Sequence, residues 1–210
     1  MSRDAILHRV RTALGRGVGQ QPPPAPPPIL RVLEVPREAR IAQFRQAFEK
    51  LNGKFHRASS NEDACAYAER LLAGRKAIAS NEPFLAACGI TRIAGVESGF
   101  KDGLELRERC AEYPLGISSA TYALADTGSL VLFSSQQEAR LISLLPPCHL
   151  AVVPADRLLT GLDELLSLHP IPSDRSSSMV LITGPSRTAD IEQILVRGVH
   201  GPGEIHVVIV

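Results

Sequence analysis

The chain lacks tryptophan, and aromatic residues make up only 4% of its 210 residues. Hydrophobic residues still account for 44% of the sequence, so we expect a core built mainly from aliphatic side chains. The sequence also lacks a block of lysine or arginine, and its formal net charge is +1. Because nucleic-acid-binding proteins carry clustered basic residues, these features argue against nucleic acid as a partner.

Long hydrophobic runs are absent as well. No apolar run approaches the roughly 18 residues that a membrane-spanning helix needs. Residues 1–17 hold no apolar segment followed by a small-residue cleavage site, which a secretory signal requires. We therefore expect a cytoplasmic protein with no membrane span.

Closely spaced cysteines are the third absence. Zinc ribbons and ferredoxin-type clusters need thiolates a few residues apart. The four cysteines here are far from one another, and none forms a Cys-x-x-Cys pair: Cys65, Cys88, Cys110 and Cys148. We expect reduced, mostly buried thiols, and neither a metal site nor a cofactor in this chain.

The N-terminal region divides into a helix and a proline-rich arm. Apolar residues recur at helical spacing through residues 2–14, and Ser2 can cap the helix. Six prolines in residues 22–28 favour an extended spacer. We therefore divide the chain into residues 1–29, the helix and arm, and residues 30–210, an α/β domain. The helix either folds back on its own domain or packs on a partner, such as a second copy held through residues 1–28.

Strand and helix patterns alternate through the rest of the chain. Such alternation predicts an α/β fold with a mostly parallel sheet and helices on both faces. Ligands of such folds bind at the carboxyl ends of the strands. The last predicted elements are a strand at 149–155, a helix near 161–168, a strand at 179–182, a helix at 188–197 and a strand from 204.

A hydroxyl-rich turn with one arginine follows the apolar residues 179–182. If the following segment is a helix, its N-terminus exposes unpaired N–H groups and a partial positive charge. These groups would bind a phosphate or carboxylate together with the turn residues Gly184, Ser186, Arg187 and Thr188. In the alternative reading, Thr188 only caps the helix and Arg187 pairs with a carboxylate of the protein.

A second polar loop, Asp126-Thr127-Gly128-Ser129, lies between two apolar runs. Gly128 permits a tight turn or the close approach of a ligand. The Asp-Thr-Gly sequence is also found in aspartic proteases, but those enzymes need two such loops and an all-β fold. Arg140, a few residues further on, could bind an anion or pair with Asp126.

Two histidines are the candidate neutral bases among these segments. His149 lies at the start of a predicted strand, and His200 lies in a loop of glycine and proline. Each is at least as well explained as a hydrogen-bonded structural residue. Cys148 and His149 point to opposite sides of a strand, which excludes them as a nucleophile–base pair.

Taken in order, these segments resemble the lactate utilization protein C family (LutC/YkgG, the LUD domain). The resemblance rests on GISSATYALADTGSLVL at 116–132, then Arg140, LPPCHLAVV, GPSRTADIE and GVHGP. The family commonly has glutamate at the position of Asp126 and often threonine at that of Ser118. The resemblance implies a three-layer α/β fold similar to ribose-5-phosphate isomerase and CoA transferases. It also implies a role in oxidising L-lactate to pyruvate with iron–sulfur partner proteins, which would carry the redox centres.

The leading hypothesis is therefore a subunit of a lactate-oxidising system that binds a small carboxylate or phosphate. In it, Arg187 would clamp the anion, and His149 or His200 would take the hydroxyl proton. One alternative is a stand-alone isomerase or acyl/CoA transferase, although the motifs offer only Glu138 and Glu192 as nucleophilic glutamates. Another is a non-catalytic assembly or regulatory module.

Overall fold

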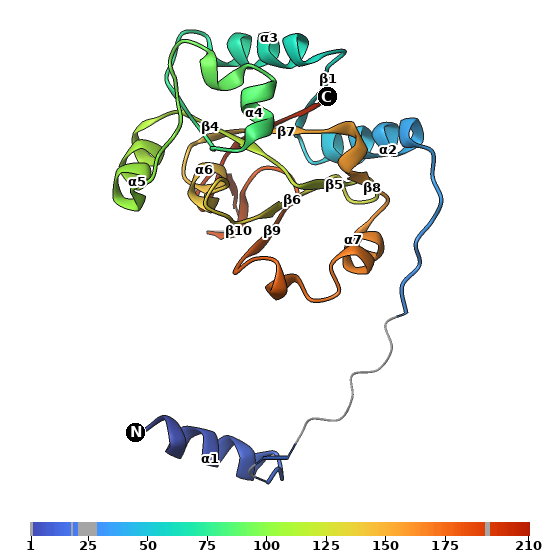
Figure 1. The fold of residues 1–210 in the computed structure, drawn as a ribbon, viewed down its shortest axis with the longest axis vertical. Coiled ribbons are helices and arrows are strands. Elements are labelled where there is room, and N and C mark those ends of the chain that lie inside the picture. The colour runs from blue at the N-terminus through green and yellow to red at the C-terminus, as the bar shows by residue number, and fades with distance from the viewer. Residues whose placement is uncertain (1, 18, 21–28, 192–193) are drawn as a thin grey trace.

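The computed structural model describes residues 2–17, 19–20, 29–191 and 194–210 (Figure 1). The proline-rich segment expected at residues 22–28 lies outside these ranges. The helix predicted before it is present as α1 (Arg3–Ala13), and the Ser2 hydroxyl accepts a hydrogen bond from the backbone N–H of Ala5 at 3.3 Å. This helix buries none of its residues, and docking through this region stays a prediction.

A six-stranded sheet forms the centre of the domain. All its neighbouring strands run parallel, which confirms the prediction of a mostly parallel sheet. In spatial order they are β1 (Lys54–Arg57), β12 (Glu204–Ile209), β7 (Cys148–Val153), β4 (Leu115–Ser119), β2 (Ala77–Ala79) and β3 (Val96–Glu97). The central strands are apolar and buried on both sides, as parallel strands covered on two faces require.

One face of this sheet is covered by helices. These are α3 (Asn61–Leu72), α4 (Pro83–Ala87) and the short 3₁₀ helix η1 (Ile90–Arg92). The Ser60 side chain caps α3 by accepting a hydrogen bond from Asp63, and small alanines let α3 lie close to the strands. In Figure 1, α3 and α4 lie on one side of β4 and β7, with α6 and β6 on the other.

The opposite face is covered by helices and by a second sheet. The helices are α2 (Arg37–Lys50), α5 (Gly103–Glu112) and α6 (Arg140–Leu144). The second sheet contains β8 (Leu158–Leu159), β5 (Tyr122–Leu124), β6 (Ser129–Phe133) and β9 (Met179–Ile182), in that order. Helix α7 (Leu162–Leu168) packs on this sheet, and two 3₁₀ turns, η2 (Ala155–Arg157) and η3 (Pro172–Asp174), flank it. The three-layer expectation is confirmed, with a sheet taking part of one helical layer.

The helix predicted at 188–197 is wrong. The segment forms an antiparallel hairpin of β10 (Arg187–Ile191) and β11 (Ile194–Arg197). The apolar residues 191, 194 and 195 fit helical spacing, but the β-branched residues of this segment favour strands. The expected buried strand at 179–182 is β9, a partly exposed edge strand of the second sheet.

None of the helices in the described ranges is long and apolar enough to cross a membrane.

Candidate functional site

The two motif loops pack against the C-terminal end of α2. Gly128 has a φ of +65°, and a Cβ there would lie 2.6 Å from the backbone nitrogen of Phe48. Gly184 has a φ of +81°, and a Cβ there would lie 2.8 Å from the Cβ of Leu51. Only glycine combines this backbone conformation with such close approach. The two glycines therefore serve to seat the loops on the helix.

Hydroxyl groups join the two loops directly. The Ser129 hydroxyl lies 2.8 Å from Thr127 Oγ1 and 2.7 Å from Thr183 Oγ1. Arg187 extends to α2, where its guanidinium donates a hydrogen bond to the backbone carbonyl of Leu51, the C-terminal cap residue. A cation at this end of a helix is stabilised by the unpaired carbonyls. The loops thus meet as the sequence predicted, but Arg187 already has a partner within the protein.

The proposed support from a helix N-terminus is absent at this turn. Thr188 pairs with Val196 in the hairpin, so no helix begins here. The Ser186 backbone bonds to Pro202 and Gly198, which fastens the turn to the loop that carries the exposed His200. The helix-dipole part of the sequence argument is therefore wrong, whereas a ligand-binding role for these residues stays a prediction.

Asp126 and Arg140 lie apart from this turn in their contacts. Asp126 is exposed, and its backbone N–H donates to Thr160; a side chain at Gly161 would collide with its carboxylate. Arg140 is exposed at the start of α6, and its guanidinium lies 3.4 Å from the Ser178 hydroxyl. The expected pairing of these two residues is not among the ion pairs of the described residues.

His149 is completely buried between β4 and β12. Its Nε2 lies 2.7 Å from the Ser118 hydroxyl, and its Nδ1 has no hydrogen-bond partner among the described residues. Desolvation lowers the pKa of His149 to about 3, and the nearby His206 lowers it further. The imidazole is therefore neutral at physiological pH, and its burial favours the structural role that the sequence left open.

A cavity lies at the carboxyl edge of the large sheet. Its walls include Ser119 at the end of β4, Pro154 just after β7 and Glu82 just beyond β2. The cavity volume is about 220 Å³. Its remaining lining residues are Ala120, Thr121, Arg157 and Arg175. This is the edge at which open α/β sheets bind ligands, and the size suits a small metabolite.

Two arginines give this cavity a positive charge. The guanidinium of Arg175 lies 4.6 Å from the centre of the Phe133 ring, and that of Arg157 lies 5.8 Å from the centre of the Tyr122 ring. Aromatic faces hold these groups without consuming their N–H donors, although Arg175 Nη1 also lies 3.1 Å from His169 Nε2. Glu82 is the acidic lining residue; desolvation raises its pKa, and Arg175 acts in the opposite direction. The two cations outnumber it, so the cavity favours an anion.

A buried carboxyl group, Glu138, lies behind the cavity wall. Its Oε2 accepts a hydrogen bond from the Ser119 backbone at 3.1 Å, whereas Oε1 and the adjacent Ser80 hydroxyl lack partners of good geometry. Desolvation raises the pKa of Glu138 to about 8; Ser80 and the Ser119 N–H lower it, and Glu82 raises it. The group is therefore mostly protonated at neutral pH, which adds no negative charge to the cavity.

A larger cavity of about 380 Å³ lies between α3 and α4. Glu62, Glu69 and Arg92 are its charged residues, so its net charge is unfavourable for an anion. It also lies in the outer helical layer, away from the strand ends. We therefore take the carboxyl-edge cavity as the candidate site.

Potential metal ligands lie at the other end of the large sheet. Among the described residues, Cys148, Glu204 and His206 are the group whose donor atoms come close together. One thiol does not match the set of cysteines that holds an iron–sulfur cluster. All four cysteines are free and three are buried, which confirms the expected state of the thiols.

Sequence reasoning did not select the cavity residues. Glu82 and Ser119 follow short predicted strands, so the rule that ligands bind at strand ends could have found them. Arg157 and Arg175 lie outside the recognised motifs, and no spacing in the sequence connects them. Glu138 was considered only as a nucleophile, because its burial depends on the fold.

Comparison with known proteins identifies the family. The LUD domain family model matches residues 41–210. Lactate utilization protein C of Halalkalibacterium halodurans is 35% identical over 61% of this chain and 59% of its own length. That of Geobacillus thermodenitrificans is 26% identical over 96% of this chain and 92% of its own length.

The fold has a solved counterpart. A DUF162 family protein from Deinococcus radiodurans superposes with a TM-score of 0.66 and 19% identity, covering 84% of this chain and 99% of its own. This likeness supports the three-layer α/β architecture. Because the family model matches most of the chain, from residue 41 to residue 210, the chain belongs to the LUD domain family, as its motifs indicated.

Proposed function

We propose that this chain is a cytoplasmic subunit of a system that oxidises L-lactate to pyruvate, and that its carboxyl-edge cavity binds lactate or a similarly small anion. The names of its relatives support the pathway, and the family membership extends over residues 41–210. The observation that carries the binding role is the pair Arg157 and Arg175 in a small cavity at the carboxyl edge of a parallel sheet.

The cavity suits a carboxylate for three physical reasons. A guanidinium offers a fork of N–H donors that matches the two oxygens of a carboxylate. The protonated Glu138 avoids the repulsion that an ionised carboxylate would exert. The Thr121 and Ser119 side chains supply hydroxyls for the polar remainder of a hydroxy acid.

Lactate oxidation breaks the C–H and O–H bonds at the hydroxyl-bearing carbon, forms a C=O bond, and releases two electrons and two protons. In the proposed system the electrons pass to iron–sulfur partner proteins and the protons to solvent. This chain would bind and orient the acid, since it supplies cationic and hydroxyl groups and no cluster of thiolates.

A reconstitution experiment tests the proposal. Cells lacking this chain should lose lactate-dependent reduction of an electron acceptor in extracts, and the purified wild-type chain should restore it. The Arg157→Ala/Arg175→Ala double variant should fail to restore it, whereas Arg187→Ala should succeed. Failure of Arg187→Ala alone would move the site to the sequence-predicted residues Gly184, Ser186 and Thr188 with the 126–129 loop. Iron and acid-labile sulfide co-purifying with the chain would support the partner assignment, and their absence would contradict it.

A second candidate is a stand-alone enzyme that acts on a small anionic metabolite. The observation that favours it is Glu138, a buried carboxyl with an unpaired oxygen next to the cavity. Its protonated state disfavours nucleophilic attack at neutral pH. Turnover of acyl-CoA or sugar phosphate substrates by the purified chain, abolished by Glu138→Gln, would establish this alternative.

A further inference from the structure

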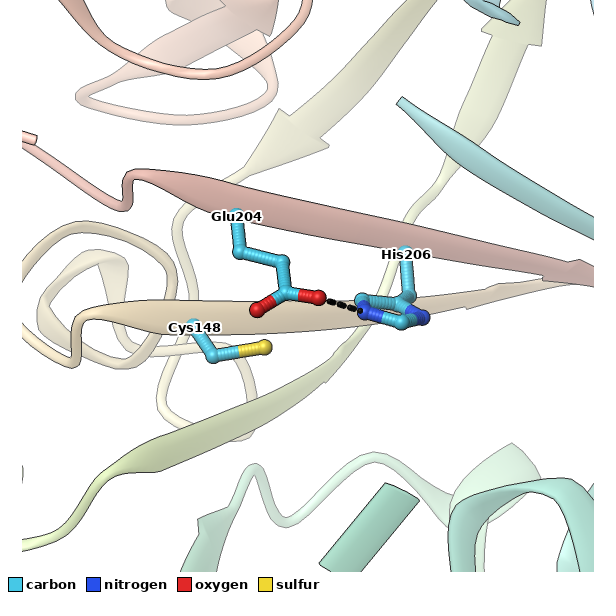
Figure 2. A group of neighbouring side chains, drawn as sticks. All are labelled: Cys148, Glu204 and His206. Atoms are coloured by element: carbon cyan, nitrogen blue, oxygen red, sulfur yellow. Dashed lines mark hydrogen bonds and ion pairs between the residues drawn. The ribbon is translucent and has the colours of Figure 1, made fainter. Parts of the chain in front are cut away.

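The amino edge of the large sheet carries a second group of reactive side chains, unrelated to the cavity. Cys148 begins β7 and Glu204 begins β12, and the two residues are paired in the parallel ladder. Paired residues project from the same face, and His206 projects from that face two residues further along β12. Figure 2 shows the three side chains converging, with the thiol directed toward the space between the carboxylate and the imidazole.

The donor atoms are close enough for one ion. One nitrogen of His206, one oxygen of Glu204 and the sulfur of Cys148 all lie within 4.8 Å of one another. The nitrogen and oxygen, His206 Nε2 and Glu204 Oε1, are 2.9 Å apart. Bonds of about 2.0–2.3 Å to a tetrahedral zinc ion place its ligand atoms roughly 3–4 Å apart. Small side-chain rotations therefore suffice to bring the three atoms to bonding distance.

The histidine is already oriented as a metal ligand would be. Its other ring nitrogen, Nδ1, lies 2.7 Å from the Tyr67 hydroxyl, so an Nδ1–H can donate there and leave the Nε2 lone pair facing Glu204. Tyr67 is itself held by stacking on His56, with ring centres 4.6 Å apart. Metal-bound histidines usually have such a partner on the second nitrogen, which fixes the tautomer and the ring orientation.

Burial and exposure are divided in a way that suits an ion at the sheet rim. Cys148 is 7% exposed and His206 is 4% exposed, whereas 44% of the Glu204 side chain is exposed. The ion would therefore rest on a buried thiolate and imidazole and reach solvent beside the carboxylate. Three protein ligands with an open position are typical of zinc sites that retain a water molecule.

We propose that Cys148, Glu204 and His206 bind a Zn²⁺ ion, with water as the fourth ligand. Binding replaces the Cys148 S–H bond by a Zn–S bond, and the thiol proton passes to solvent. Mixed sulfur, nitrogen and oxygen donors favour zinc over magnesium or calcium, which prefer oxygen ligands alone. The spacing of cysteines in the sequence could not predict this site, because its three donors come from two strands far apart along the chain.

Lys54 is the competing cation. Its ammonium group forms an ion pair with Glu204, and 59% of its side chain is exposed. Glu204 has two carboxylate oxygens, so one can bind the ion while the other keeps the contact with Lys54. Because two nearby cations repel each other, removing the lysine charge should strengthen zinc binding.

Metal binding to the purified full-length chain tests the proposal. Competition with a chromophoric chelator measures the Zn²⁺ affinity, and Co²⁺ substitution reports the ligands through a thiolate-to-cobalt charge-transfer band. Wild type should bind Zn²⁺ at a single site and show the band. Cys148→Ser should lose the band, whereas Cys110→Ser, which removes another buried thiol, should keep it. Tyr67→Phe should weaken Zn²⁺ binding about 10- to 100-fold, and Lys54→Met should strengthen it.

Two results would overturn the site. One is the absence of Zn²⁺ binding or of the cobalt band in wild type. The other is a Zn²⁺ affinity that Cys148→Ser and Tyr67→Phe both leave unchanged, which would place the ion elsewhere. Circular dichroism of each variant separates lost binding from lost folding, and Lys54→Met keeps the test open if Cys148→Ser unfolds. A fall in Zn²⁺ affinity in Lys54→Met would also contradict the proposal.

Discussion

The motif loops and the carboxyl-edge cavity are both rich in polar groups, but they use them differently. In the loops, the Ser129 hydroxyl bonds to Thr183, and Arg187 bonds to the end of α2. In the cavity, Arg157 and Arg175 lie against aromatic rings, which leaves N–H groups available for a ligand. A memorable sequence motif can therefore serve packing, while residues with no motif form the binding surface. The predictions below separate the two roles by measuring stability and binding in the same variants.

The largest effect is expected from Gly128→Ala in the motif loop. The substitution forces a left-handed backbone on alanine and places its Cβ against the backbone of Phe48. We expect the free energy of unfolding in urea to fall by about 2–4 kcal/mol, with the L-lactate affinity of the folded fraction unchanged. Gly103→Ala at the start of α5 is the control, since its Cβ would meet nothing within 4 Å. A loss of affinity without a loss of stability would reverse the assignment.

Arg175→Ala should produce the opposite pattern. Losing a charged hydrogen-bond donor to the ligand should weaken L-lactate binding about 10- to 100-fold, measured by isothermal titration calorimetry. Only the contacts with Phe133 and His169 are lost from the fold, so stability should fall by about 1 kcal/mol or less. Arg187→Ala is the matched control on the motif side, and its affinity should equal that of wild type. Equal affinities in all three proteins would place the ligand outside both regions.

Glu138→Gln should change the pH dependence of stability. The folded-state pKa of about 8 lies above the ordinary value of 4.5, so the native protein binds the extra proton more tightly than the unfolded chain. Wild-type stability from this group is fully present below pH 4.5 and is lost as the pH rises through about 8. The glutamine variant lacks this titration and should exceed wild type by about 1–2 kcal/mol more at pH 9 than at pH 5. Parallel urea midpoints at the two pH values would show that Glu138 is ionised in the folded protein.

The smallest effect is expected from Ser129→Ala. The substitution removes the hydroxyl that joins the two motif loops and should lower the free energy of unfolding by about 1 kcal/mol. Binding of L-lactate should be unaffected. Thr183→Val removes the partner hydroxyl, so the double variant should cost less than the sum of the single variants. Additive costs would show that the two hydroxyls act independently.

The sequence predicted the elements whose signals are local. Helix α3 has a serine cap and a regular apolar face, and β7 is a continuous apolar run, so both were placed nearly correctly. The hairpin at 187–197 was missed because its apolar residues also fit helical spacing, and strand pairing depends on residues further along the chain. The cavity was missed for a related reason. Arg157, Arg175 and Glu138 come from separate loops, and only the folded sheet brings them together.

A crystal structure of the chain with L-lactate bound would test the central claim most directly. The account predicts the lactate carboxylate within hydrogen-bond distance of Arg157 or Arg175 at the carboxyl edge of the large sheet. A lactate molecule bound at the turn of Ser186 and Arg187, or between α3 and α4, would contradict it.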